Sequence, residues 1–357
     1  MRPRRGAKQY DTRRARGLHG AMLLSGELFA DNAARGRVTP PIQVRATARP
    51  ASERPTDTDQ NVELQAAPGR ASAWLDSVIA RLLSASDERG RIAHAVRVFL
   101  AFGIKEAWVC LFGGLMVALL IGTHMWYPAH AALPRYDALT IAAVVIQIAL
   151  IALRLETWDE VAVIALFHVA GTCMELFKTA VGSWVYPEFS YLRIGGVPLF
   201  SGFMYASVGS YITRACRGFN LRFSHHPPFV ATAALSAGIY ANFFLHHYLP
   251  DCRYLLMGAA VILFRRCWVY FVIGKAVHRM PFLLAFVLIS GFIWLAENVG
   301  TYSRAWLYPS QINGWAMVSV AKWGSWFMLT IMSYVMVTLV DRPRGIAEAP
   351  VGAVRIG

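Results

Sequence analysis

Two stretches of the chain, ELFKTAVGSWVYP at residues 175–187 and ENVGTYSRAWLYP at residues 297–309, share the pattern E-x3-T-x4-W-x-Y-P. Each stretch ends a long apolar run, and 122 residues separate each residue of the first copy from its counterpart in the second. The same offset relates His124 to His246. The sequence therefore indicates that the chain contains two copies of one hydrophobic unit.

The composition is typical of a membrane protein. Hydrophobic residues make up 56% of the 357 residues and charged residues only 16%, a balance that excludes an ordinary soluble domain. The formal net charge is +14. Because basic residues beside membrane spans orient them and attract anionic lipids, this charge requires no nucleic acid. Membrane lipids are therefore the expected partners, and no protein partner follows from the sequence.

The apolar runs predict an all-α fold, a polytopic transmembrane helical bundle of about eight spans of bilayer length. The spans are placed near residues 100–125, 137–154, 160–182, 196–215, 228–248, 254–274, 281–302 and 315–340. Spans one to four match spans five to eight, so we expect two parallel four-span repeats related by a twofold axis along the membrane normal. Basic residues gather in the loops of one side, which favours both termini on the cytoplasmic side.

The domain organisation follows the same pattern. Residues 1–70 are rich in Arg, Ala and Pro and are expected to be a disordered basic cytoplasmic tail. Apolar residues recur at helical spacing from Trp74 to Leu83, which predicts an amphipathic surface helix within 71–95. The first repeat is expected at 96–218, the second at 219–342, and a short cytoplasmic tail at 343–357.

The predicted topology gathers ionisable and polar side chains toward the outer face. A carboxylate inside the bilayer must be neutral, paired or facing water. We therefore expect Glu175 and Glu297 to be candidate acids or proton carriers, with Lys178 and Lys322 as their cationic partners. Residues three, four or seven apart share a helix face. This spacing predicts an outer pocket whose further candidate ligand-binding residues are His168, Thr179, Trp184, Tyr186, Asn242, His246, Trp294, Asn298 and Thr301.

Each of these residues also has a structural interpretation. A Glu with a Lys one turn away forms an ion pair that fixes helix register in many bundles. Trp184 and Tyr186, with their counterparts in the second copy, occupy the positions of an interfacial aromatic belt. The His246-His247 pair, together with His124 and the two glutamates, could ligate a metal, but no HExxH or comparable spacing is present. Hydrogen-bonded histidines are the favoured interpretation, and neither a metal nor another cofactor is predicted.

The chain resembles a known family along most of its membrane region, about residues 95–340. It is similar there to the bacterial membrane protein family catalogued as domain-of-unknown-function family 817. The resemblance implies an integral protein of the bacterial cytoplasmic (inner) membrane and assigns no activity. The segments that carry it are PRYD (134–137), ETWDE (156–160), FH (167–168), ELFK (175–178), GSWVYPE (182–188), GVPLFSGFMYA (196–206) and WLAEN (294–298).

A second resemblance concerns the segment GSWVY at 182–186 followed by GVP at 196–198. These elements are similar to a G-x-W-x-Y element and a G-x-P element of the membrane carotenoid cyclases and hydratases. In that class a carboxylic acid protonates a polyene and aromatic faces stabilise the cation. The chain lacks the Pro-x-Glu-Glu that follows in the cyclases, so the resemblance assigns no catalytic residue.

Three functions remain open on the sequence. Glu175 and Glu297 could bind, or act by acid-base chemistry on, an apolar or isoprenoid-like small molecule. A proton-coupled small-solute transporter would use the same carboxyls, because parallel repeats with binding groups at their interface are a transporter architecture. A structural or partner-binding membrane protein would lose only stability when either Glu is replaced by Gln. Whether the protein is an enzyme stays undecided at this point.

Overall fold

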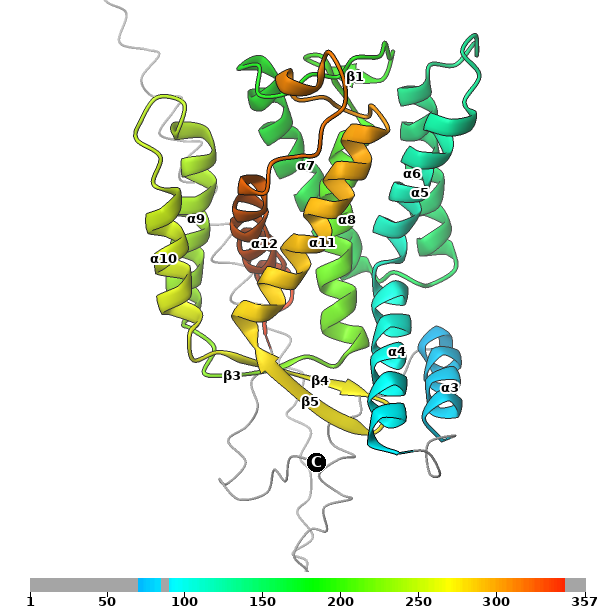
Figure 1. Ribbon diagram of the computed structural model, residues 1–357, viewed down its shortest axis with the longest axis vertical. Coiled ribbons are helices and arrows are strands. Elements are labelled where there is room, and N and C mark those ends of the chain that lie inside the picture. The colour runs from blue at the N-terminus through cyan, green and yellow to red at the C-terminus, as the bar shows by residue number, and fades with distance from the viewer. Residues whose placement is uncertain (1–69, 85–89, 344–357) are drawn as a thin grey trace, which may run out of the picture. The chain divides into compact units, whose positions relative to one another are not determined.

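The computed structural model describes residues 70–84 and 90–343 and is mostly helical (Figure 1). The tails predicted at 1–70 and 343–357 therefore lie almost wholly outside the described residues. The helices are α3 (Arg70–Ser84), α4 (Arg91–Val109), α5 (Leu111–Trp126), α6 (Arg135–Ala152), α7 (Trp158–Ala180), α8 (Phe200–Gly218), α9 (Phe229–Leu245), α10 (Arg253–Phe264), α11 (Phe282–Tyr302) and α12 (Ala321–Val340). A 3₁₀ turn, η1, covers Pro309–Gln311. The strands are β1 (Arg193–Ile194), β2 (Val197–Pro198), β3 (Arg222–Ser224), β4 (Trp268–Ile273) and β5 (Ala276–Pro281).

Four helices within the described residues, α6, α7, α11 and α12, are long and apolar enough to cross a bilayer. The pair α4 and α5 meets the same criterion as one broken span, which would make a fifth. Helices α9 and α10 are apolar but shorter. The protein is thus a helical membrane protein, and the number of membrane-length helices is lower than the eight spans that the sequence predicts.

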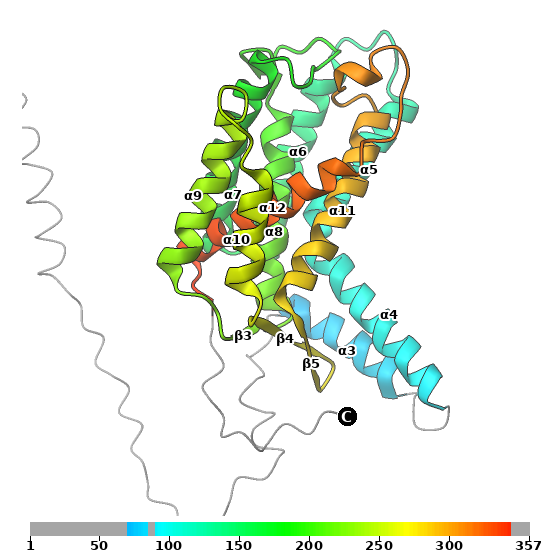
Figure 2. The same cartoon turned by 60° about the vertical axis from the view of Figure 1, so that its left-hand side comes forward.

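The first predicted span, 100–125, is not one straight helix. Helix α4 ends at Val109, α5 begins at Leu111, and the two helices bend by 75° at the break. Helix α4 carries Lys105, whose ammonium donates a hydrogen bond to the Val272 carbonyl oxygen at 2.9 Å. Helix α4 packs against α3 and β4 as well as against α8, and these contacts hold it at an angle to α5 (Figure 2).

Helix α3 covers most of the stretch in which the sequence predicts an amphipathic helix. Leu75 and Ile79, one turn apart, are buried against Ala101 of α4 and Ile273 of β4. Trp74 on another face is 63% exposed. One apolar stripe of α3 is therefore occupied by protein contacts, as expected for an amphipathic helix beside a larger body.

The sixth predicted span, 254–274, is wrong in its second half. Helix α10 ends at Phe264, two arginines follow, and the run WVYFVI at 268–273 forms β4. This strand pairs with β5 around the turn residues Gly274 and Lys275, and with β3 on its other edge. Gly274 has φ of 60°, which suits the tight turn of a two-residue hairpin. The β-branched and aromatic residues of this run favour a strand.

The described part of the bundle has two distinguishable ends. The sheet of β3, β4 and β5 and helix α3 lie at one end, called here the hairpin end (Figures 1 and 2). The loops that follow α7 and α11, which carry the two W-x-Y-P motifs, lie at the opposite end, called here the motif end. Most residues of the predicted pocket belong to helices that run between these two ends, whereas Trp184 and Tyr186 lie in the loop after α7 and His246 directly follows α9.

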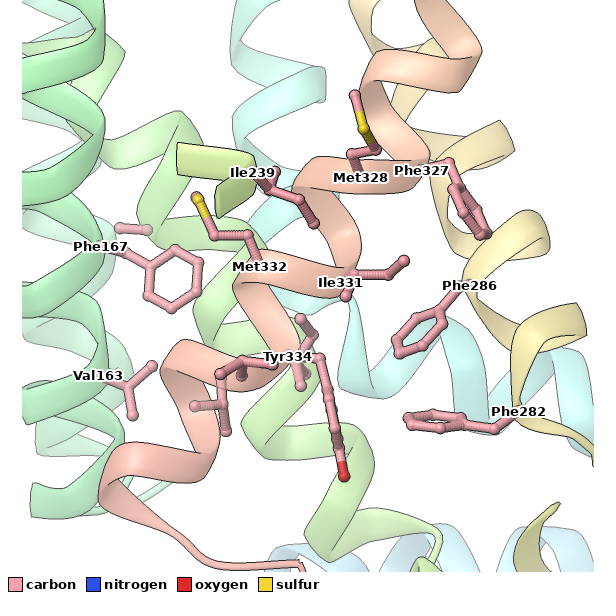
Figure 3. Close-up of a cluster of buried hydrophobic side chains, with 14 of the residues drawn as sticks. Val163, Phe167, Ile239, Phe282, Phe286, Phe327, Met328, Ile331, Met332 and Tyr334 are labelled. Atoms are coloured by element: carbon pink, nitrogen blue, oxygen red, sulfur yellow. The ribbon is translucent and has the colours of Figure 1, made fainter. Parts of the chain in front are cut away.

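The main hydrophobic cluster surrounds α12, which packs against α7, α8, α9 and α11. Ile331 of α12 is fully buried, and Tyr334 packs on the rings of Phe282 and Phe286 (Figure 3). Such dense aromatic and aliphatic packing leaves few voids. The cluster fixes α12 against the helices that carry the two glutamates.

Candidate functional site

Glu175 lies near the end of α7, and its carboxylate accepts three hydrogen bonds from neutral donors. Trp184 Nε1 donates at 2.7 Å and Tyr186 Oη at 2.6 Å, both from the loop after α7. Tyr205 Oη donates at 2.8 Å from α8. The close approach of Tyr205 depends on Gly171, where a β-carbon would lie 2.5 Å from the Tyr205 side chain. With only 3% of its surface exposed, Glu175 is satisfied entirely by protein groups.

Glu297 holds the equivalent place near the end of α11 and accepts two hydrogen bonds. Tyr308 Oη donates to one oxygen, and Trp326 Nε1 of α12 donates to the other at 2.7 Å. Gly300 makes room for the Trp306 ring, since a β-carbon at Gly300 would overlap that ring. In both copies of the motif the tyrosine of W-x-Y-P donates to the glutamate. A further donor comes from α8 for Glu175 and from α12 for Glu297.

The two carboxylate environments adjoin each other. Val185 and Leu307, which occupy the same position of the two motifs, form an antiparallel bridge with reciprocal N–H···O bonds of 2.9 Å. The Trp184 ring packs edge-on against Tyr308 at 6.1 Å. Burial, together with the neighbouring carboxylates, raises the pKa of Tyr186 and of Tyr308 well above the usual value. Both phenols therefore keep their protons and act as hydrogen-bond donors.

The lysines do not pair with the glutamates as the sequence analysis expected. The Lys178 ammonium lies 2.7 Å from His247 Nε2 and 3.3 Å from His246 Nε2. The Lys322 ammonium lies over the Tyr308 ring, 4.6 Å from its centroid. Within the described residues neither lysine forms an ion pair with a carboxylate. The helical spacing of Glu175 and Lys178 allowed such a pair, but the neutral donors already occupy the carboxylate.

The other candidate residues of α11 make contacts with the segment before α12 and with α12 itself. Asn298 accepts from the Val318 backbone N–H at 2.9 Å and ties α11 to the segment before α12. Thr301 accepts from Trp315 Nε1 at 3.2 Å in the same region. Trp294 stacks on Trp323 at 6.3 Å, and its own indole N–H is buried without a partner among the described residues. These contacts give the residues positioning roles rather than a free polar surface.

The remaining candidates are dispersed. Asn242 bonds Asp251 and the Cys252 backbone, which fixes the loop between α9 and α10. His168 packs edge-on against Phe203 at 4.8 Å in the middle of the α7–α8 contact. The buried Thr179 hydroxyl has no hydrogen-bond partner in the described part of the chain. The structure thus brings the glutamates, their Trp and Tyr donors and the lysines toward the motif end, and leaves His168 outside this group.

A small hollow lies between α7, α8, α11 and α12. It encloses about 370 Å³ of empty space including its mouth, of which about 20 Å³ is wide enough for the centre of a water molecule. Its lining is almost entirely apolar and includes Met174, Met332 and Met336. Tyr205 and Trp326 also line it, and these are the donors that α8 and α12 supply to Glu175 and Glu297.

Tyr205 and Trp326 are members of the site that the sequence did not predict. They are separated by 121 residues, one fewer than the offset of the motif, and they are different residue types. A search for identical residues at the fixed offset therefore passes over them. They could be found by searching α8 and α12 for an aromatic side chain with a hydrogen-bond donor at nearly the same position along each helix.

Comparisons with known proteins identify the family of this chain. The family model described as "Protein of unknown function (DUF817)" matches residues 98–334. The chain is 45% identical over 244 residues to the uncharacterized protein YoaT of Bacillus subtilis (strain 168), a match that covers 68% of this chain and 92% of that protein. No solved structure matches the chain. The chain therefore belongs to the DUF817 family.

Proposed function

We propose that residues 96–218 and 219–342 are two copies of one four-helix unit. Helices α5, α6, α7 and α8 would correspond to α9, α10, α11 and α12. The contacts support this assignment, because the packing of α5 on α6, α5 on α8 and α7 on α8 recurs as α9 on α10, α9 on α12 and α11 on α12. Helix α8 packs on α12, its own counterpart.

The bridge between Val185 and Leu307 supports a twofold axis between the copies. Counterpart residues contact each other reciprocally only where a twofold axis passes between them. An even number of helices in each copy puts that axis along the membrane normal. Both termini then lie on the cytoplasmic side of a bacterial inner membrane, together with basic residues of the hairpin end such as Arg222, Lys275 and Arg279.

We further propose that the protein binds a small, largely apolar molecule in the hollow between the two copies. The observation that carries this proposal is the lining of the hollow, which both copies supply and in which Tyr205 and Trp326 connect directly to Glu175 and Glu297. Ligand sites are typically apolar and carry a few convergent polar groups. Interfaces between repeats are a common place for them.

The narrowness of the hollow constrains the ligand. Drug-sized ligands occupy roughly 300–1,000 Å³, and only a small part of this hollow admits even water. Binding therefore requires side chains to move. Met174, Met332 and Met336 are suited to this, because unbranched thioether side chains repack at low cost.

The two carboxyls give the proposed site its chemistry. A ligand group that displaces Tyr205 or Trp326 leaves one carboxyl oxygen free to accept a hydrogen bond. A carboxyl that takes up a proton in a low-dielectric site can donate it to a ligand as a general acid. Glu175 and Glu297 are accordingly proposed as the groups that recognise or protonate the ligand.

Mass spectrometry of co-purifying small molecules tests this function. The wild-type protein is compared with the Glu175→Gln, Glu297→Gln double variant, both shown to be folded by a cooperative thermal unfolding transition. Asp159→Asn is the matched control, since it makes the same carboxyl-to-amide change at an exposed position at the other end of α7. We expect a compound enriched with wild type and control and lost from the double variant. Identical profiles from all three folded proteins would refute the proposal.

A further inference from the structure

We propose that Lys178, Lys322 and Arg253 form a binding site for a small oxyanion, the carboxylate or phosphate group of a ligand, toward the motif end of the bundle. The three cations come from α7, α12 and α10. None of them lines the hollow described above. The proposal therefore does not depend on the function proposed for that hollow.

Lys178 provides the first evidence. Only 4% of the residue is exposed, and its ammonium contacts the imidazole nitrogens of His246 and His247 and the face of the Phe243 ring. Within the described residues no carboxylate forms an ion pair with it. A buried ammonium without a directly paired carboxylate is costly. The two imidazoles occupy two of its three N–H donors, which leaves one for a ligand.

The neighbouring charges make the cluster electropositive. The positive charges of Lys322 and Arg253 both act on Lys178, as does the opposite charge of Asp251, and Arg253 also acts on Lys322. Asp251 is held by Arg253 at 3.1 Å and by Asn242 at 3.1 Å. Glu297 acts on Lys322 and Asp251 on Lys178, so the three cations outnumber the two acids that act on them. A bound oxyanion would relieve the mutual repulsion of the cations.

Neither lysine has a lysine at the equivalent position of the other proposed copy. At the 122-residue offset the counterpart of Lys178 is Gly300, and the counterpart of Lys322 is Phe200. Phe200 is fully buried against Tyr136. The repeated scaffold therefore forms without a lysine at either position. A role beyond packing is the simplest reason for two ammonium groups to be present in one cluster.

The site is open to the surface through His247, whose ring is exposed. Partial burial of that ring and the charge of Lys178 lower the pKa of His247. The ring therefore stays neutral at pH 7 and its Nε2 can accept from the Lys178 ammonium. A soluble anion or the head group of a lipid can reach the ammonium from this side.

Thermal unfolding of the full chain in detergent, titrated with sodium phosphate against sodium chloride at equal ionic strength, tests the proposal. We expect saturable stabilisation of the wild type by phosphate. In Lys178→Gln and Lys322→Gln the phosphate concentration that gives half of the stabilisation should rise by at least about tenfold. Lys275→Gln is the matched control, because it removes the same charge at the exposed turn between β4 and β5. We expect it to behave as wild type.

Two results would overturn the proposal: equal stabilisation by chloride and phosphate, or an equal phosphate response of all four proteins. Lys322 is only half-buried, so Lys322→Gln keeps the test valid if Lys178→Gln does not fold. The Glu175→Gln, Glu297→Gln variant should retain the phosphate response. Loss of its co-purifying compound with phosphate binding intact separates the two proposals.

The source of the oxyanion is decided by native mass spectrometry from nanodiscs of phosphatidylcholine with and without phosphatidylglycerol. Retention of phosphatidylglycerol by wild type and Lys275→Gln, and its loss from the Lys178→Gln, Lys322→Gln double variant, would identify a lipid head group. Equal loss of phosphatidylglycerol from all proteins, with the phosphate response preserved, would identify a soluble anion. Either result supports the oxyanion site.

Discussion

Tyr186 and Tyr308 donate the same hydrogen bond to counterpart glutamates, yet the loss of each should have a different effect. Tyr186→Phe leaves Glu175 with Trp184 and Tyr205 as donors, whereas Tyr308→Phe leaves Glu297 with Trp326 alone. A buried acceptor that loses a partner is destabilised by about 1–3 kcal/mol. We expect the free energy of unfolding to fall by about 1 kcal/mol in Tyr186→Phe and about 2 kcal/mol in Tyr308→Phe.

Thermal or denaturant unfolding in detergent measures both changes. Tyr254→Phe serves as the control, because Tyr254 is 81% exposed and the substitution is expected to change the stability by less than about 0.5 kcal/mol. Equal losses for the two buried tyrosines would show that the number of donors at each carboxylate does not set its stability.

The duplicated glutamates could be predicted from the sequence, but the direction of their neighbours could not. The motif spacing identified Glu175 and Glu297 as equivalent groups near helix ends. It also suggested Trp184 as an interfacial anchor, whereas that ring is only 8% exposed and its N–H points to Glu175. Spacing gives the position of a loop residue along the chain. The side of the loop that turns inward depends on contacts with the other motif, such as the Val185 bridge to Leu307.

The contact between α7 and α8 depends on small residues at the point of closest approach. A β-carbon at Gly171 would lie 2.5 Å from the Tyr205 side chain, so Gly171→Ala must push α8 away or turn Tyr205 from Glu175. Overpacking of a tight contact typically destabilises by about 1–3 kcal/mol. We expect Gly171→Ala to lower the free energy of unfolding by a similar amount, of about 2 kcal/mol.

Gly114→Ala on α5 is the matched control, because a β-carbon there meets nothing within 4 Å. Ala is favoured over Gly in a helix by up to about 1 kcal/mol, so this control should be neutral or slightly stabilising in the same unfolding assay. Destabilisation of both variants by the same amount would attribute the effect to helical glycine in general and not to the α7–α8 contact.

At the level of helices and strands, hydropathy predicts the long helices correctly, but it gives the wrong secondary structure where the apolar run is short. Helices α7, α11 and α12 lie close to their predicted spans. The run at 268–273 was assigned to a span, but it is a strand bounded by Arg266 and by the Gly274 turn. Apolar runs of this length are ambiguous between helix and strand on periodicity alone. The bend at Cys110 could not be predicted either, because α4 is held at its angle by tertiary contacts with α3, α8 and β4.

For the whole molecule, the repeat could be proposed from sequence because identical residues recur at one offset. The sequence could not show that the two motifs touch each other. The bridge between Val185 and Leu307 joins the two motifs directly, and the hollow draws its lining from helices of both proposed copies. Two functions considered for the chain make opposite demands on this bridge. A static binding site tolerates a fixed contact, whereas a transporter must move one copy against the other.

A disulfide across this bridge distinguishes these functions. The reciprocal N–H···O bonds make Val185 and Leu307 a hydrogen-bonded antiparallel pair, whose Cα atoms lie about 5.5 Å apart, within the range that a disulfide spans. We expect the Val185→Cys, Leu307→Cys variant to form a bond between the introduced thiols, detected by peptide mass spectrometry without reductant. The single variants control for pairing with the native thiols.

Because the proposed ligand binds between copies that remain in contact, the locked protein should retain its co-purifying compound. Absence of the bond despite reactive thiols would refute the pairing, and loss of the compound only in the oxidised protein would show that binding requires the copies to separate.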